Sequence, residues 1–83
     1  MKAIIRVQLK KGILDPQGKA VNNALHHLGF ESIRDVRIGK YIEMDLGEVN
    51  HETATNIVEE SCKKLLSNPV IEDYFYDLVE DGE

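Results

Sequence analysis

The chain has 83 residues, a net charge of −5 and one cysteine. This length suits a single domain, residues 1–83, and a domain this small buries only about 60–65% of its unfolded surface. The acidic excess argues against nucleic-acid binding, which needs clustered positive charge. No apolar run approaches the roughly 20 residues of a membrane span, and the lone Cys62 is typical of a reducing cytoplasm.

A chain of this size often gains stability from a disulfide, a metal or a partner subunit. Cys62 has no intrachain partner, and three histidines without a second cysteine make a poor metal-ligand set. We therefore expect no metal or cofactor in this chain, and we expect oligomerisation or docking to supply the additional buried surface.

The first half of the chain predicts a strand and a helix. Residues 3–10 alternate between apolar and polar, the pattern of a half-buried strand. Asp15 and Pro16 are typical of a helix start, as N-cap and first helical residue. Apolar residues then follow at helical spacing up to Gly29, which is a typical C-terminal stop: Ala20, Val21, Ala24, Leu25 and Leu28.

The second half predicts two strands, a helix and a last strand. Residues 33–46 alternate around a break at Gly39 and Lys40, which indicates either a tight hairpin or one long bent strand. Asn50 is a good N-cap for a helix over residues 51–67. Asn68 and Pro69 end that helix, and residues 70–80 predict a final strand.

The predicted order is β-α-β-β-α-β. We therefore expect an α+β fold, a two-layer ferredoxin-like sandwich with a four-stranded antiparallel sheet and two helices on one face. The other face would be polar in an isolated monomer, yet Ile4, Tyr41, Phe75 and Val79 are predicted to lie on it. Such a patch usually marks an interface, so these four residues are the candidates for self-association as a homodimer or homotetramer.

Catalytic groups do not converge in the sequence. Cys62 falls on the apolar side of the second helix, which is typical of a buried structural thiol. His26 and His27 point about 100° apart on a helix. The acidic pairs at 59–60 and 72–73 diverge in the same way, and no phosphate-binding loop, nucleophile elbow or CxxC motif is present. We therefore predict no catalytic residue in this chain.

Three segments carry a family resemblance: residues 14–20 (LDPQGKA, followed by LGF at 28–30), residues 36–40 (VRIGK) and residues 62–74 (CKKLLSNPVIEDY). Together they resemble the PurS family, the small subunit of phosphoribosylformylglycinamidine (FGAM) synthase. Each segment alone is a weak signal, whereas the three in this order cover nearly the whole chain.

The resemblance implies a non-catalytic subunit of an ATP-dependent amidotransferase ligase in purine biosynthesis. In this family PurS assembles with a PurL-type synthetase and a PurQ-type glutaminase, bridges them and supports the transfer of ammonia. ATP, magnesium and glutamine are used by those other subunits. The complex makes FGAM from formylglycinamide ribonucleotide (FGAR), ATP and glutamine.

Two groups of residues are candidates for contacts with partner subunits: Asp15, Gln17, Gly18 and Lys19 at the helix start, and Arg37, Gly39 and Lys40 at the expected hairpin. Helix capping is the alternative role for Asp15, and solvated charge is the alternative for Arg37 and Lys40. A second function also stays open, a regulatory homodimer of the ACT type that binds a metabolite between protomers.

Overall fold

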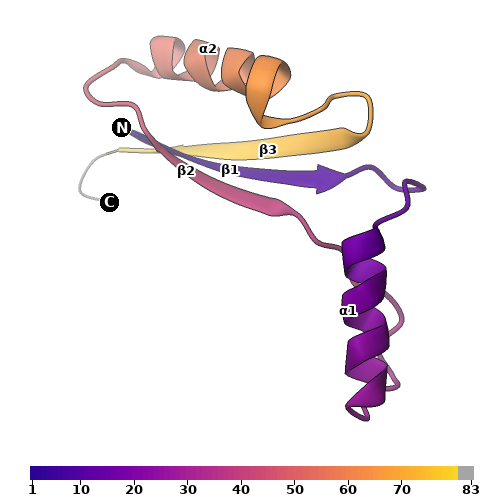
Figure 1. Cartoon of the computed structure of the whole chain (residues 1–83). Helices are drawn as coiled ribbons and strands as arrows, with labels where there is room; N and C mark the ends of the chain where they lie inside the picture. Colours follow the sequence, from indigo (N-terminus) through magenta and orange to yellow (C-terminus); the bar gives the residue numbers. More distant parts are fainter. Residues whose placement is uncertain (81–83) are drawn as a thin grey trace.

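The computed structural model describes residues 1–80. In chain order it has β1 (Lys2–Leu9), α1 (Pro16–His27), β2 (Lys40–Asp45), α2 (His51–Ser61), a π-helix η1 (Cys62–Leu66) and β3 (Glu72–Val79). The strands pair antiparallel in the order β2-β1-β3. As Figure 1 shows, α2 lies over one face of the sheet, whereas α1 extends away from it.

The core lies between β1 and α2. Ala3, Ile5 and Val7 of the central strand are fully buried, and they pack with Val58 and Cys62. The residues on the same face of the two outer strands are only half-buried. Strands lie about 4.8 Å apart and a helix with side chains is about 10 Å wide. One helix therefore covers the central strand well and leaves both flanks of this inner face partly open.

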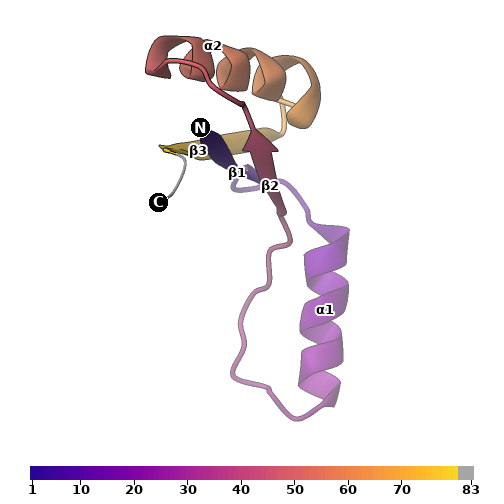
Figure 2. The same cartoon turned by 90° about the vertical axis from the view of Figure 1, so that its left-hand side faces the viewer.

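The position of α1 corrects the expectation that two helices cover one face. The sole buried residue of α1 is Gly18, and Val21 and Leu28 are exposed. Residues 28–39 return beside α1, as Figure 2 shows. We call residues 16–39 the arm. Because the arm projects from the sheet, the radius of gyration is 16.3 Å, against about 12 Å for a compact domain of this length.

The expected four-stranded ferredoxin-like sandwich is also corrected. Three strands are present within residues 1–80, and residues 33–38 form no strand. The break at Gly39 and Lys40 marks the start of β2 instead of a hairpin turn. A side-chain carbon at Gly39 would lie 2.6 Å from the carbonyl oxygen of Val7, so glycine allows the chain to join the sheet edge here. The α+β class and the antiparallel sheet are confirmed.

The predictions from Asn50 onward are confirmed in outline. Asn50 caps α2, because its Oδ1 accepts a hydrogen bond of 2.7 Å from the Thr53 amide. The helical path continues through η1, where the Ser67 amide donates to the Cys62 carbonyl at 3.0 Å. The final strand begins at Glu72, two residues later than expected.

Glu59 ties α2 to β3. Its carboxylate accepts hydrogen bonds from the hydroxyls of Tyr74, at 2.6 Å, and Tyr76, at 2.8 Å. These two donors, Tyr74 first, lower the pKa of Glu59 from its ordinary value of 4.5. The same bond, with desolvation, raises the pKa of Tyr74 to about 12. The cluster therefore favours an ionised Glu59 beside two neutral tyrosines.

These shifts predict a pH window for stability. The pKa of Glu59 is lower in the folded chain than in the unfolded chain. Glu59 therefore contributes to folding stability above pH 4.5, and this contribution is lost as the pH falls through the folded pKa. The pKa of Tyr74 is higher in the folded chain than in the unfolded chain. Tyr74 therefore contributes to folding stability below pH 10.0, and this contribution is lost as the pH rises toward about 12. Urea unfolding from pH 3 to 12 should show both losses.

The Glu59→Gln variant is the control for this prediction. It should be less stable than the wild type at pH 7, and both losses should be smaller, because the shared carboxylate is gone. The assignment to this cluster would be wrong if the variant kept the acid and alkaline losses of the wild type.

Candidate functional site

The two groups of predicted contact residues meet at the base of the arm, where it leaves the sheet. The Asp15 carboxylate accepts hydrogen bonds from the Gly18 amide, at 2.9 Å, and the Ile38 amide, at 2.7 Å. It therefore connects the first turn of α1 to the end of the returning segment. Among the described residues, Asp15 is the one charged residue that is buried, with 6% of its surface exposed. The backbone donors, Gly18 first and then Ile38, lower the pKa of its carboxyl.

Gly18 makes this close approach possible. A side-chain carbon at this position would collide with the carbonyl oxygen of Val36 and lie 2.8 Å from Asp15 Oδ2. The helix and the returning segment can therefore come this close only because residue 18 has no side chain. Glycine is poor for helix stability, and close packing explains its place inside α1.

Arg37 holds the base of the arm from the other side. One guanidinium nitrogen, Nη2, donates to the Ile13 carbonyl at 2.9 Å and to the Lys10 carbonyl at 3.3 Å. These bonds join the returning segment to the loop between β1 and α1. We call Asp15, Gly18, Arg37 and Ile38 the junction. A surface depression of 420 Å³ lies beside it, lined by Gln8, Leu9, Lys11, Gly12, Asp35 and Arg37.

The structure divides the predicted contact residues into two sets. Asp15, Gly18, Arg37 and Gly39 make the contacts within the chain described above. Gln17, Lys19 and Lys40 are exposed around them, and Lys40 Nζ lies 3.9 Å from a carboxylate oxygen of Glu72. Sequence reasoning missed Ile38, because its contribution is a backbone amide and carries no side-chain signal.

The predicted self-association residues do share the outer face of the sheet, opposite α2. Arg6 pairs in register with Tyr41 on one side and Phe75 on the other. Tyr41 is 64% exposed and Phe75 is 49% exposed. Ile4 and Val79 lie on the same face and are half-buried.

Charges interrupt this outer face, so it is not one continuous apolar patch. Ile4 lies in register with Glu43 and Asp77. Ion pairs join Lys2 to Glu43 at 3.9 Å and Arg6 to Asp77 at 3.7 Å. A surface that alternates aromatic groups with charges suits recognition of a complementary protein surface.

The remaining candidates do not converge within residues 1–80. Cys62 is fully buried, and burial followed by the nearby Glu59 raises the pKa of its thiol. His26 contacts the Ile33 carbonyl at 2.7 Å, while His27 contacts the Asn23 carbonyl at 2.8 Å. Each histidine is thus engaged with a different part of the backbone.

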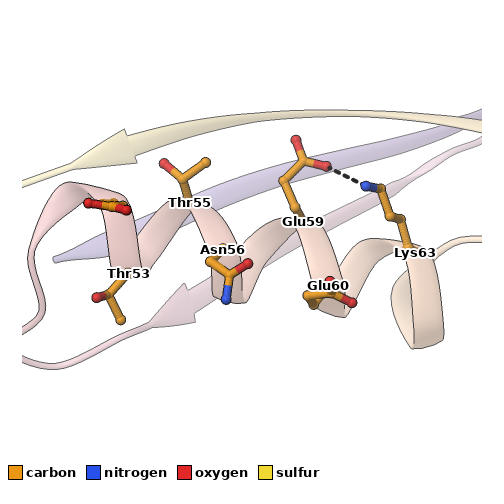
Figure 3. Close-up of a pocket in the computed structure, with 7 residues that line it drawn as sticks. Thr53, Thr55, Asn56, Glu59, Glu60 and Lys63 are labelled. Atoms are coloured by element: carbon orange, nitrogen blue, oxygen red, sulfur yellow. Dashed lines mark ion pairs between the residues drawn. The ribbon is translucent and has the colours of Figure 1, made fainter.

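A depression of 710 Å³ runs along the helical segment of α2 and η1, as Figure 3 shows. Its lining residues are Glu52, Thr53, Thr55, Asn56, Glu59, Glu60 and Lys63. All seven belong to this one helical segment, so the depression is lined from one side only. Glu59 and Lys63 form an ion pair of 3.9 Å there. This arrangement is a solvated helix flank.

Together these features define a small α+β protein whose organised surfaces are a projecting arm and an uncovered sheet face, both suited to contacts with other chains. The family model "PurS: Phosphoribosylformylglycinamidine (FGAM) synthase" matches residues 2–80. The chain belongs to the PurS family.

Relatives support this assignment over most of the chain. The PurS subunit of Bacillus subtilis is 46% identical over 79 residues, which cover 95% of this chain and 93% of the relative. The PurS subunit of Methanocaldococcus jannaschii is 45% identical and covers 88% of each chain. Within residues 1–80, none of the helices has the length and apolar character needed to cross a membrane.

Solved structures of the family share the fold. A structure of B. subtilis PurS has a TM-score of 0.85 at 46% identity, covering 95% of this chain and 98% of that chain. The structure described as PurLQS from Thermotoga maritima has a matching chain with a TM-score of 0.82 at 32% identity, covering 94% of this chain and 95% of that one.

The junction predicts a specific effect of Gly18→Ala. The added carbon must push the returning segment away from α1, and overpacking of this kind costs roughly 1–3 kcal/mol. We expect faster hydrogen exchange of the Ile38 amide, while amides of the β1–β3 ladder keep their protection. NMR exchange measurements test this.

Gln17→Ala is the matched control, because Gln17 is an exposed neighbour in the same helical turn. It should leave exchange of the Ile38 amide unchanged. Equal exchange of that amide in Gly18→Ala and the wild type would contradict the role given to Gly18.

Proposed function

We propose that this chain is the PurS-type subunit of an FGAM synthase, the ligase of purine biosynthesis that converts FGAR, ATP and glutamine to FGAM. The observation that carries the proposal is the family match over residues 2–80. The name of the B. subtilis relative, phosphoribosylformylglycinamidine synthase subunit PurS, and the description of a T. maritima chain with the number EC 6.3.5.3 support it.

In this proposal the chain works with PurL-type synthetase and PurQ-type glutaminase subunits in the cytoplasm. The PurLQS structure from T. maritima supports such an assembly. ATP, magnesium and glutamine are bound by the other subunits, and this chain contributes no catalytic residue. Its task is to hold the synthetase and glutaminase in the arrangement that lets ammonia pass between them.

The base of the arm is the proposed contact with these subunits. The junction is held by buried or internally bonded groups, so the side chains around it are presented on a fixed backbone. Gln17, Lys19 and Lys40 are exposed there. Their amide and ammonium groups suit an acidic or polar partner surface.

The outer sheet face is the proposed surface for self-association as a homodimer or homotetramer. Tyr41 and Phe75 supply aromatic contact area, and Ile4 and Val79 extend it. Regulation by an ACT-type metabolite site is less well supported, because the PurS match already accounts for nearly the entire chain.

Phe75→Asp should weaken this self-association. An aspartate midway along β3 on the outer face adds a charge that must be desolvated on contact, and Arg6 in register tolerates it within the monomer. We expect at least a tenfold rise in the dissociation constant by sedimentation equilibrium, with an unchanged far-ultraviolet circular dichroism spectrum.

Val70→Asp is the control, since Val70 is 80% exposed but lies outside the strands. If Phe75→Asp and Val70→Asp associate like the wild type, the outer face is not the self-association surface.

Reconstitution tests the function. Purified PurL-type and PurQ-type subunits from the same organism are assayed for FGAM formation with glutamine or with ammonia as nitrogen donor. Adding this chain should raise the glutamine-dependent rate at least tenfold and change the ammonia-dependent rate much less. Equal glutamine-dependent rates with and without the chain would remove the proposed role.

Lys19→Glu refines the same assay. Reversing this exposed charge at the base of the arm should raise the concentration of chain needed for half-maximal glutamine-dependent activity. Lys64→Glu reverses an exposed charge on η1 and should behave like the wild type.

A further inference from the structure

We propose that the depression beside the junction binds the carboxylate group of a small metabolite, between Lys11, the Gly12 amide and Arg37. This inference goes beyond the proposed function and does not rest on it. The site is also separate from the exposed residues that face partner subunits in that proposal.

Unpaired positive charge is confined to one region of the chain. Within residues 1–80, six of the ten lysines and arginines lie 3.1 to 3.9 Å from a carboxylate, in the pairs Lys2–Glu43, Arg6–Asp77, Lys10–Asp73, Lys40–Glu72, Lys63–Glu59 and Lys64–Glu60. The other four have no ion pair with a described carboxylate: Lys11, Lys19, Arg34 and Arg37. All four belong to the arm or to the loop that leads into it, so an anion is attracted to this end of the molecule.

Two of these four cations line one depression. Its volume is 420 Å³, and its lining residues are Gln8, Leu9, Lys11, Gly12, Asp35 and Arg37. They belong to two parts of the chain, the end of β1 with the loop after it and the returning segment, which Arg37 holds together. A depression of this size accepts a small ligand, whereas Lys19 and Arg34 are exposed outside it.

Arg37 is fixed in position without being neutralised. Its Nη2 donates to the carbonyls of Ile13 and Lys10, at 2.9 and 3.3 Å. Carbonyl oxygens hold the guanidinium but carry no net charge. The N–H groups on Nη1 and Nε make no hydrogen bond within residues 1–80. A guanidinium that is already held in place loses little entropy when its remaining donors bind a carboxylate.

The loop after β1 adds a backbone donor. Lys10 to Ile13 form a turn, closed by a hydrogen bond of 3.2 Å from the Ile13 amide to the Lys10 carbonyl. Gly12 is the third residue of this turn and has a φ of 86°, which glycine adopts without strain. Its amide donates no hydrogen bond within residues 1–80. An unused backbone N–H that follows a lysine is a second kind of donor for an anion.

Asp35 sets the charge that the site accepts. It lines the same depression as Lys11 and Arg37, yet it forms an ion pair with neither of them. Two cations and one carboxylate leave a net charge of +1, which one negative charge balances. Repulsion by Asp35 therefore favours a singly charged carboxylate over an oxyanion with two charges.

An NMR titration of the full chain with sodium acetate tests the site. With the ionic strength held constant by sodium chloride, the signals of the Gly12 amide and the Arg37 Nε–H should shift together and saturate. We expect a dissociation constant below about 50 mM, a modest value for so small a ligand. The amide of Thr53 at the start of α2 is the remote reference and should not move. Sodium sulfate should bind at least threefold more weakly.

Three outcomes of this titration would overturn the inference. They are shifts that do not saturate, shifts of equal size at Thr53, and tighter binding of sulfate than of acetate. The titration uses the chain alone, so its result does not depend on whether the chain activates the synthetase and glutaminase subunits.

Two variants with opposite expected effects test the lining residues. Lys11→Gln removes a positive charge and should weaken acetate binding at least threefold. Asp35→Asn removes the repulsion and should strengthen it at least twofold. Neither side chain forms a hydrogen bond or an ion pair within residues 1–80, so both variants should keep the fold.

Lys19→Gln is the matched control, because it removes an unpaired lysine charge of the arm that lies outside the depression. It should bind acetate like the wild type. If Lys11→Gln binds acetate as tightly as Lys19→Gln, or if Asp35→Asn weakens binding, the depression is not a carboxylate site.

Discussion

The bond pair made by Asp15 determines the shape of this molecule. One carboxylate accepts from Gly18 at the start of α1 and from Ile38 at the end of the returning segment. A buried carboxylate is stable here because both backbone donors and the nearby Arg37 favour its charged form. The arm consequently stands away from the sheet, the apolar side of α1 faces outward, and a single helix is left to cover three strands.

A second carboxylate performs the matching task on the sheet. Glu59 accepts from two tyrosines of β3 and keeps α2 over the core. Each helix is thus positioned by one acid with two donors. The positions of both helices depend on acids that are ionised near neutral pH, which is consistent with a chain whose net charge is negative. Asp15 and Glu59 are engaged in holding elements together, and the exposed surfaces are left for recognition.

Local signals in the sequence predicted the elements well and their placement less well. Asp15 and Asn50 correctly predicted the starts of both helices. The alternation of apolar and polar residues predicted the ends of β1 and β3 to within two residues. The contact of Gly18 with Val36 joins residues 18 positions apart, and no local pattern encodes it. The same limit explains why Gly18 and Arg37 were predicted as partner contacts, although their observed contacts are internal. The family resemblance identified these segments as important without saying that their importance is partly structural.

The misplaced helix has a physical cause that bears on function. The spacing of Val21, Leu25 and Leu28 says that one side of α1 is apolar, and burial of that side stabilises the helix equally well against its own sheet or against another chain. An amphipathic period therefore predicts that one side of the helix is in contact with something, but it does not say whether the partner is the same chain or another chain. The choice is made by the junction, which a short set of backbone bonds controls. The described residues hold no convergent group of reactive side chains. The junction instead exposes apolar side chains of α1 that a closed monomer would bury in its core. The apolar side of α1 is thereby left to be buried by contact with other chains.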